Sequence, residues 1–416
     1  MNMHGLRIGC IADDFTGGSD AASFLRKAGL ETVLVDGTGG LGILKTLQAE
    51  AAVVALKSRS IPAAEAVSQT LAAARELLAL GAGQLYFKYC STFDSTPRGN
   101  IGPVTDALME LTESRYTLLC PSLPVNGRTV RGGILYVNGV PLAESPMRDH
   151  LVNPMTCSEI PALMKPQSRC PCLALGEPGT WDGALAAALA EYPRFTLVPS
   201  YETDEDGERI ARAFGGLPLL TGGSGLLEHL GRRFGGSRTE ELPGAVCPGL
   251  PRLLLAGSCS ATTQRQVDAY LAHGKAAVRI EPDKLLQGLQ TEEALRQAIQ
   301  AADGDLLLYS TASPGQVRHS QRRGAKAVSG LLEPLMGRLA VYGREAGFRR
   351  IIVAGGETSG AVIRALGVRA FRIGEDAAPG VPELWPADRP ELCLALKSGN
   401  FGDEGFFLRA LADGPI

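Results

Sequence analysis

Two adjacent carboxylates, Asp13 and Asp14, open the segment of the chain that is richest in groups able to do chemistry. They follow an apolar run, Leu6–Ala12, that predicts a first β-strand, and a Thr-Gly-Gly-Ser turn then leads into a helix expected over Asp20–Ala28. Ligands of open α/β sheets bind beyond the carboxyl ends of the strands. There the two carboxylates can hold hydroxyl groups, accept a proton or help to bind Mg²⁺. A turn with a helix cap is the alternative explanation.

Further polar side chains follow the other strands expected in the first half, which are predicted near 31–35, 51–56, 84–87 and 116–120. They are Lys57, Ser58 and Arg59, then Lys88, Ser91, Thr92, Asp94 and Ser95, and later Asn126, Gly127 and Arg128. Lysine and arginine bind carboxylates, whereas aspartate and asparagine bind hydroxyls. Any one of these residues is explained equally well as a solvated loop residue. Together they predict a site for a small, anionic, hydroxylated ligand.

The second half of the chain contains glycine loops that also follow apolar runs. Gly355–Gly360 follows a strand expected over 350–354 and opens a helix expected over 361–366. Lys397–Gly402 follows a strand near 392–396, and Gly257–Thr263 follows one at 252–256. Glycines let the backbone approach a phosphate, and free N–H groups at a helix start donate hydrogen bonds to it. The loops predict a nucleotide site, with tight turns for packing alone as the alternative.

The elements that carry these residues alternate between strand and helix. This pattern predicts an α/β fold with mostly parallel sheets. A chain of 416 residues exceeds one typical core, so we expect two α/β domains with an active-site cleft between them. Residues 235–251 are rich in glycine, proline and charge, which favours a boundary near residue 240 and domains over 1–240 and 241–416.

Composition excludes several classes of protein. A formal net charge of −3 provides no electrostatic basis for binding nucleic acid or a membrane surface. No apolar run is long enough for a membrane span, and no signal peptide is recognisable, so we expect a cytoplasmic protein. The 9 scattered cysteines are expected to be reduced thiols. No phosphate-binding P-loop and no dinucleotide fingerprint after the first strand are present.

Six segments, in this order along the chain, resemble the four-carbon acid sugar kinase family. They are Ile11–Gly17, Phe87–Thr96, Pro124–Thr129, Gly222–Leu226, Gly355–Gly360 and Leu396–Gly402. The segments within Lys88–Ser95 and Asn126–Thr129 favour the 3-oxo-tetronate 4-kinase branch over the related D-threonate and D-erythronate kinases. The resemblance covers nearly the whole chain.

The resemblance implies a sugar-acid-binding N-terminal domain and a nucleotide-binding C-terminal domain. On the sugar-acid side it implies Asp13, Asp14, Lys57, Arg59, Lys88 and Asp94. From these and the other polar residues after the strands, we expect Asp13, Asp14 and Lys88 to be catalytic, and substrate contacts from Lys57, Arg59, Ser91, Thr92, Asp94, Asn126 and Arg128. On the nucleotide side it implies contacts from Ser258, Gly355, Gly356, Glu357, Thr358 and Gly399, and the hydroxyl of Ser359 in the same glycine loop is expected to join them.

These implications lead to one expected activity. The chain is expected to be an ATP-dependent kinase that phosphorylates the O4 hydroxyl of a 3-oxo-tetronate with the help of Mg²⁺. The sequence does not identify the side chains that would bind this ion. Either Asp13 or Asp14 is expected to act as the base. The same chemistry on D-threonate or D-erythronate and a non-catalytic sugar-acid sensor are the alternatives. The expected partners are the sugar acid and ATP, with a homo-oligomer left open.

Overall fold

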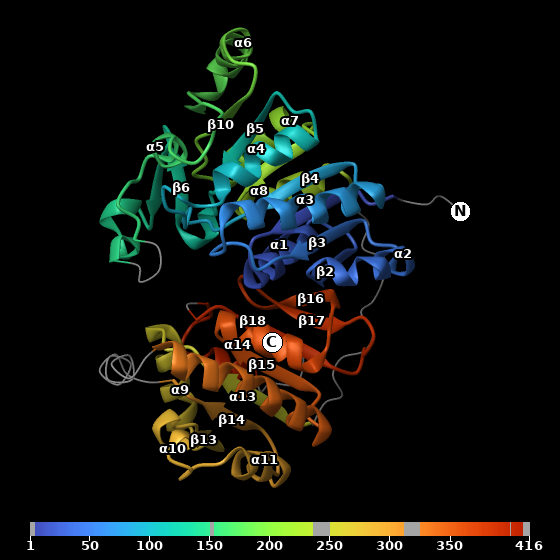
Figure 1. The fold of residues 1–416 in the computed structure, drawn as a ribbon, viewed down its shortest axis with the longest axis vertical. Coiled ribbons are helices and arrows are strands. Elements are labelled where there is room, and N and C mark those ends of the chain that lie inside the picture. Colours follow the sequence, from blue (N-terminus) through green and yellow to red (C-terminus); the bar gives the residue numbers. More distant parts are fainter. Residues whose placement is uncertain (1–4, 150–153, 236–249, 312–324, 400, 411–416) are drawn as a thin grey trace. The chain divides into compact units, whose positions relative to one another are not determined.

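The computed structural model describes residues 5–149, 154–235, 250–311, 325–399 and 401–410. The chain divides into two compact units, Met1–Thr239 and Glu240–Ile416. Each unit consists of a largely parallel β-sheet with helices packed on it, as Figure 1 shows. The predicted α/β class with mostly parallel sheets is confirmed.

The sheet of the first unit has the strand order β2-β3-β1-β4-β11-β5-β10-β9, and neighbouring strands in it pair in parallel. The strands are β1 (Ile8–Ala12), β2 (Thr32–Asp36), β3 (Ala51–Ala55), β4 (Gln84–Lys88), β5 (Tyr116–Cys120), β9 (Cys172–Ala174), β10 (Phe195–Val198) and β11 (Leu219–Gly222). The central strands β1, β3 and β4 are wholly buried. Burial on both faces explains why they read as continuous apolar runs in the sequence.

The helices of the first unit cover this sheet in packed groups. Helix α3 packs against α4, and α8 packs against both α1 and α7. The helices are α1 (Phe15–Lys27), α2 (Leu44–Leu47), α3 (Ala63–Ala79), α4 (Ile101–Leu111), α5 (Ile160–Met164), α6 (Trp181–Glu191), α7 (Asp204–Phe214) and α8 (Gly225–Arg232). Short 3₁₀ turns occupy Thr38–Ile43, Pro124–Asn126, Leu142–Glu144, Pro146–Asp149 and Pro178–Thr180.

Helix α1 begins earlier than the sequence predicts. The expected Thr-Gly-Gly-Ser turn is the first turn of the helix, which starts at Phe15 instead of Asp20. The reason is the cap: the side chain of Asp14 accepts a hydrogen bond from the N–H of Gly17 at 2.8 Å. This cap outweighs the low helix propensity of two glycines. Gly29 has a φ of 91° just beyond the end of the helix, a conformation that favours glycine.

A small antiparallel sheet lies outside the main one. It consists of β6 (Arg128–Arg131), β7 (Ile134–Val137) and β8 (Val140–Pro141). Asn138 and Gly139, a pair that is typical of tight hairpin turns, join β7 to β8 with φ values of 52° and 80°.

The sheet of the second unit has the order β13-β14-β12-β15-β18-β17-β16. Its strands are β12 (Arg252–Ala256), β13 (Ala277–Arg279), β14 (Leu306–Tyr309), β15 (Arg350–Ala354), β16 (Ala370–Ala378), β17 (Val381–Pro386) and β18 (Cys393–Lys397). Its helices are α9 (Ala261–Ala272), α10 (Pro282–Leu286), α11 (Glu292–Gln300), α13 (Ala325–Glu345), α14 (Gly356–Leu366) and α15 (Phe406–Arg409). Strands β13, β14, β12, β15 and β18 pair in parallel.

Two features of the second unit differ from the sequence-based expectations. Helix α14 begins at Gly356, five residues before the predicted start, because Gly355 acts as its N-cap with a φ of 128°. Strands β16 and β17 pair antiparallel at one edge and were not predicted. The pairing of these two strands is irregular, with register shifts between Ile373 and Ala378, and β17 contains prolines. These irregularities weaken the alternation that identifies a strand.

Within the described ranges, we find no helix with the length and apolar character needed to cross a membrane. The glycine- and proline-rich segment around residue 240 lies mostly outside the described residues.

Candidate active site

The ends of three neighbouring strands bring the predicted residues of the first unit to one edge of the sheet. Ala12, the last residue of β1, is in register with Ala55 of β3 and Lys88 of β4. The N–H of Asp13 donates to the carbonyl of Lys88 at 3.0 Å, and the N–H of Ser58 donates to the carbonyl of Asp13 at 2.9 Å. Backbone hydrogen bonds therefore continue beyond the strands and hold the three loops together.

Asp13 and Arg59 form a two-pronged ion pair. Arg59 donates from Nε to Asp13 Oδ2 at 2.9 Å and from NH2 to Asp13 Oδ1 at 2.7 Å. The Asp13 side chain is only 8% exposed. Burial raises the pKa of the Asp13 carboxyl, and the charge and hydrogen bonds of Arg59 act in the opposite direction. Both oxygens of Asp13 are therefore occupied by the guanidinium.

Asp14 differs from its neighbour in exposure and in free capacity. Its Oδ1 caps helix α1 and lies 2.9 Å from NH2 of Arg59. Its side chain is 32% exposed. Among the described residues, no hydrogen bond occupies its second oxygen, Oδ2. Asp14 thus presents one carboxylate oxygen that a ligand can reach.

Lys88 completes this group of charges. It is buried, and its Nζ donates to the carbonyl of Tyr89 at 3.0 Å. A Cβ atom added to Gly17 would lie 3.1 Å from that Nζ and 2.4 Å from Asp14 Oδ1. A side chain at Gly17 would therefore collide with the Asp14 carboxylate and crowd the Lys88 ammonium. The structure brings Asp13, Asp14, Arg59 and Lys88 together.

The loop after β4 carries a second unsatisfied carboxylate. Asp94 Oδ1 is buried and has no hydrogen-bond partner among the described residues. Phe93 beside it is fully buried with a φ of 50°, so a large side chain is held in the left-handed region. Thr92 is buried with its hydroxyl 2.9 Å from Cys90 Sγ, and Ser91 is half-buried. A buried carboxylate oxygen without a donor is a natural acceptor for a ligand hydroxyl.

The structure gives less support to the other predicted residues of the first unit. Lys57 is exposed. Arg128 donates to the backbone carbonyl of Asn126, and its Nε is buried without a partner. Within the described part of the chain, no hydrogen bond or ion pair links Asn126 or Arg128 to Asp13. Their proposed substrate contacts stay predictions.

The predicted nucleotide residues of the second unit converge from three strand ends. A Cβ atom added to Gly399 would lie 2.3 Å from Ser258 Oγ, and one added to Gly257 would lie 2.1 Å from Thr358 Oγ1. The N–H of Gly355 donates to the carbonyl of Lys397 at 2.9 Å. The loops after β12, β15 and β18 therefore touch one another, and only glycines fit where they meet.

The remaining predicted residues on this side lie in the first turn of α14. Gly356 is its first residue and Glu357 is exposed. Ser359 is 1% exposed, its Oγ is buried without a hydrogen-bond partner, and its N–H already donates to the carbonyl of Gly355 at 2.8 Å. The N–H of Ser359 is therefore used within the helix.

Four residues support these sites although the sequence did not single them out for a role. Asn100 Nδ2 donates to the carbonyls of Ser58 at 2.6 Å and Ile61 at 3.0 Å and so holds the loop that carries Arg59. Ser260 and Thr263 donate to the carbonyl of Gly399 at 2.6 and 2.9 Å, and Lys397 Nζ lies beneath the same loop. All four lie in or beside the quoted motifs, but the partners of Asn100, Ser260 and Thr263 are distant in sequence.

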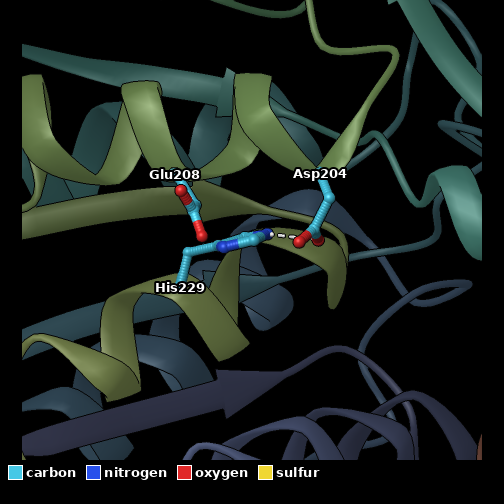
Figure 2. Close-up of side chains that lie close together, drawn as sticks. All are labelled: Asp204, Glu208 and His229. Carbon is cyan, nitrogen blue, oxygen red and sulfur yellow. Dashed lines mark ion pairs between the residues drawn. The ribbon is translucent and has the colours of Figure 1, made fainter.

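One further cluster in the first unit contains possible metal-binding groups. Figure 2 shows the imidazole of His229, on α8, between the carboxylates of Asp204 and Glu208, on α7. His229 Nε2 lies 3.2 Å from Asp204 Oδ1, and Arg232 lies 3.9 Å from Glu208. The two carboxylates are exposed and already have cationic or hydrogen-bonding neighbours. We therefore assign the cluster to the contact between the two helices.

Comparison with family profiles divides the chain into two regions, and one region lies in each compact unit. Residues 8–230 match a profile described as a sugar-binding N-terminal domain. Residues 253–407 match one described as a nucleotide-binding C-terminal domain.

Comparison with individual proteins extends over nearly the whole chain. A 3-oxo-tetronate kinase of Brucella melitensis is 42% identical, with 98% of this chain and 96% of the relative aligned. A 3-oxo-tetronate kinase of Salmonella typhimurium is also 42% identical, over 97% and 98% of the two chains. The crystal structure of a Salmonella typhimurium LT2 protein superposes with a TM-score of 0.87 at 41% identity, covering 97% of this chain and 98% of the other.

Proposed function

The chain belongs to the four-carbon acid sugar kinase family, and on this premise we propose that it transfers the γ-phosphoryl group of ATP to the O4 hydroxyl of a 3-oxo-tetronate. The substrate follows from relatives named 3-oxo-tetronate kinase that are 42% identical. We place the enzyme in the cytoplasm, where ATP is available, because its described cysteines are free thiols.

The observation that carries the proposal is the group formed by Asp13, Asp14, Arg59 and Lys88 at one edge of the first sheet. Phosphoryl transfer depends mainly on positioning and on neutralisation of charge. Asp14 has an accessible oxygen with which it accepts the proton of the attacking hydroxyl. Asp13 holds Arg59 in place, so Asp14 is the better candidate for the base.

The cations and the loop after β4 then have distinct roles. Lys88 and Arg59 bind the carboxylate of the sugar acid or the charge of the migrating phosphoryl group. Asp94 accepts a hydrogen bond from a substrate hydroxyl through its buried, unpaired Oδ1. Each role uses a group that the fold holds close to the edge of the sheet.

The nucleotide is proposed to bind where the loops after β12, β15 and β18 meet. The N–H groups at the start of α14 and the hydroxyls of Ser258 and Thr358 are suitable donors for phosphate oxygens. Mg²⁺ prefers oxygen ligands, and the Glu357 carboxylate at this edge is an oxygen donor of that kind. When bound, the ion would neutralise charge on the phosphates.

A coupled assay of ADP release tests the proposal. Purified protein is supplied with Mg-ATP and, separately, with 3-oxo-tetronates, D-threonate, D-erythronate and L-threonate. We expect turnover with a 3-oxo acid only. Turnover with D-threonate, D-erythronate or L-threonate would support kinase activity but would rule out the proposed preference for a 3-oxo acid. Absence of turnover, with ADP still bound in calorimetry, would favour a sugar-acid sensor.

A further inference from the structure

A buried lysine lies beneath the proposed nucleotide loop. Lys397 is the last residue of β18, and its side chain is 0% exposed. Its Nζ donates to Thr263 Oγ1 at 3.1 Å and to the carbonyls of Ser398 and Gly399, both at 3.2 Å. An ammonium has three protons to donate, whereas a neutral amine has two. The three acceptors therefore fit the charged form of the side chain.

The surroundings of this ammonium supply no opposing charge. The elements around it (β15, β17, α9 and α14) carry the charged residues Arg350, Glu383, Arg265, Asp268, Glu357 and Arg364. Arg350 and Glu383 pair with each other, and Arg350 is in register with Cys393, at the opposite end of β18 from Lys397. The other four side chains are exposed. Within the described ranges, no carboxylate forms an ion pair with Lys397.

Burial of an ammonium without a counter-charge is unfavourable. Transfer from water penalises the charged form, and neutral carbonyls compensate only in part. Burial accordingly lowers the pKa of the Lys397 ammonium to about 7. The acceptors of this ammonium belong to the Gly399 loop and the first turn of α9, which are parts of the proposed nucleotide site. An anion bound at that site would supply the missing negative charge.

We propose that Lys397 is a positioning residue whose buried ammonium is the counter-charge of the nucleotide phosphates, so that nucleotide binding and protonation of Lys397 favour each other. The inference rests on the proposed function, because it takes the loops around Gly399 as the nucleotide site. Lys397 acts through the carbonyl of Gly399 and through its charge. It does not reach the phosphates, because its side chain is fully enclosed.

The sign of the linkage follows from the two states. In the free protein, Lys397 loses its proton as the pH rises through about 7. Bound phosphates raise its pKa, so binding above pH 7 takes up a proton. The affinity for nucleotide therefore falls as the pH rises above 7, by up to about tenfold per pH unit, until the pKa of the bound state is reached.

Calorimetry with Mg-ADP and the full chain at pH 8 tests this linkage. Titrations in two buffers of different ionisation enthalpy give the number of protons exchanged. The wild type is expected to take up as much as about one proton per ADP. Lys397→Met keeps a chain of similar length without the charge, and it is expected to bind ADP more weakly at pH 7 and to take up no proton. In the assay, its KM for ATP rises and its KM for the sugar acid is unchanged.

A matched control separates this effect from a general loss of charge. Lys275 is an exposed lysine of the same unit, and Lys275→Met is expected to behave as the wild type. ADP binding by the wild type without proton uptake would overturn the inference, as would wild-type affinity and uptake in Lys397→Met. If Lys397→Met fails to fold, the wild-type measurement decides alone. Failure of the wild type to bind ADP at all would instead contradict the proposed function.

Discussion

At the scale of single residues, the two adjacent carboxylates differ because of what their oxygens contact. Arg59 occupies both oxygens of Asp13, whereas Asp14 keeps Oδ2 available at the surface. Identical side chains one residue apart therefore have different chemistry. The difference depends on one guanidinium, which reaches Asp13 from a neighbouring strand end 46 residues away.

Replacement of Asp14 by Asn tests its role as the base. The amide cannot accept the hydroxyl proton, so we expect kcat to fall by about 10²- to 10⁴-fold in the ADP-release assay. Asp13→Asn is expected to raise the KM for the sugar acid more than Asp14→Asn does, because Arg59 loses its partner. Asp182→Asn, at an exposed position on α6, is the matched control and should retain wild-type rates. Wild-type kcat in Asp14→Asn would rule out this assignment.

His229 makes the stability of the protein depend on pH. Burial lowers the pKa of this imidazole below its usual 6.5, although Asp204 acts in the opposite direction. The unfolded chain therefore binds the proton more readily than the folded one. The stabilisation is complete above about pH 6.5 and is lost as the pH falls through the lower pKa of the folded state.

Thermal unfolding between pH 7.5 and 5 measures this effect. We expect the melting temperature of the wild type to fall with pH more steeply than that of His229→Gln. His273→Gln, at an exposed histidine, is expected to follow the wild-type slope. Equal slopes for all three proteins would show that His229 does not contribute.

At the scale of elements, loops are held by side chains from other elements. Asn100 lies directly before α4, and its amide donates to three carbonyls of the loop after β3, those of Ser58, Arg59 and Ile61. The position of Arg59 thus depends on Asn100, whose amide protons are used to hold the loop and are not available to the substrate.

Removal of the Asn100 amide should therefore affect both stability and turnover. Asn100→Ala leaves buried carbonyls without donors, at a cost of about 1–3 kcal/mol. We expect a lower free energy of unfolding in denaturant titrations and a reduced kcat/KM for the sugar acid. Unchanged kcat/KM alongside reduced stability would show that the loop keeps its active conformation without the amide.

The loop between β12 and α9 offers a direct probe of the nucleotide site. Cys259 is exposed and lies between Ser258 and Ser260. By contrast, burial raises the pKa of Cys10 and Cys120 to about 12, so these thiols are unreactive at neutral pH.

Bound nucleotide is expected to protect Cys259. Peptide-level mass spectrometry after brief treatment with iodoacetamide should show slower alkylation of Cys259 in the presence of Mg-ADP. Cys157, in the first unit, serves as the internal reference and should be unaffected. Equal alkylation of Cys259 with and without ADP would argue against nucleotide binding at this loop.

At the scale of the whole molecule, each unit contains one of the two candidate sites. The charged group lies on the sheet of the first unit, and the glycine loops lie on that of the second. Each site is built from loops and strand ends of its own unit. We therefore expect the two ligands, each studied alone, to respond to different substitutions.

Calorimetry with single ligands measures this separation. Arg59→Ala should weaken binding of the sugar acid without changing the affinity for ADP. Thr358→Val, which removes a hydroxyl and keeps the shape, should weaken ADP binding without changing the affinity for the sugar acid. A loss of both affinities in either variant would mean that the two sites are coupled before catalysis.

The sequence by itself determined the α/β class and most strands. Strands β5, β12 and β15 lie where the apolar runs predict them, because strands buried on both faces need continuous apolar residues. The sequence also identified the polar residues that follow those strands. The parallel arrangement brings the carboxyl ends of neighbouring strands to one edge, so residues distant in sequence become neighbours there.

Only the tertiary structure decided which of those residues act together. The bidentate contact of Arg59 with Asp13 and the hydrogen bond from Lys397 to Thr263 join residues that are 46 and 134 positions apart in the sequence. Sequence patterns report local preference and burial. Hydrogen-bond partners and the absence of a counter-charge depend on how the strand ends meet in space, which no local pattern contains.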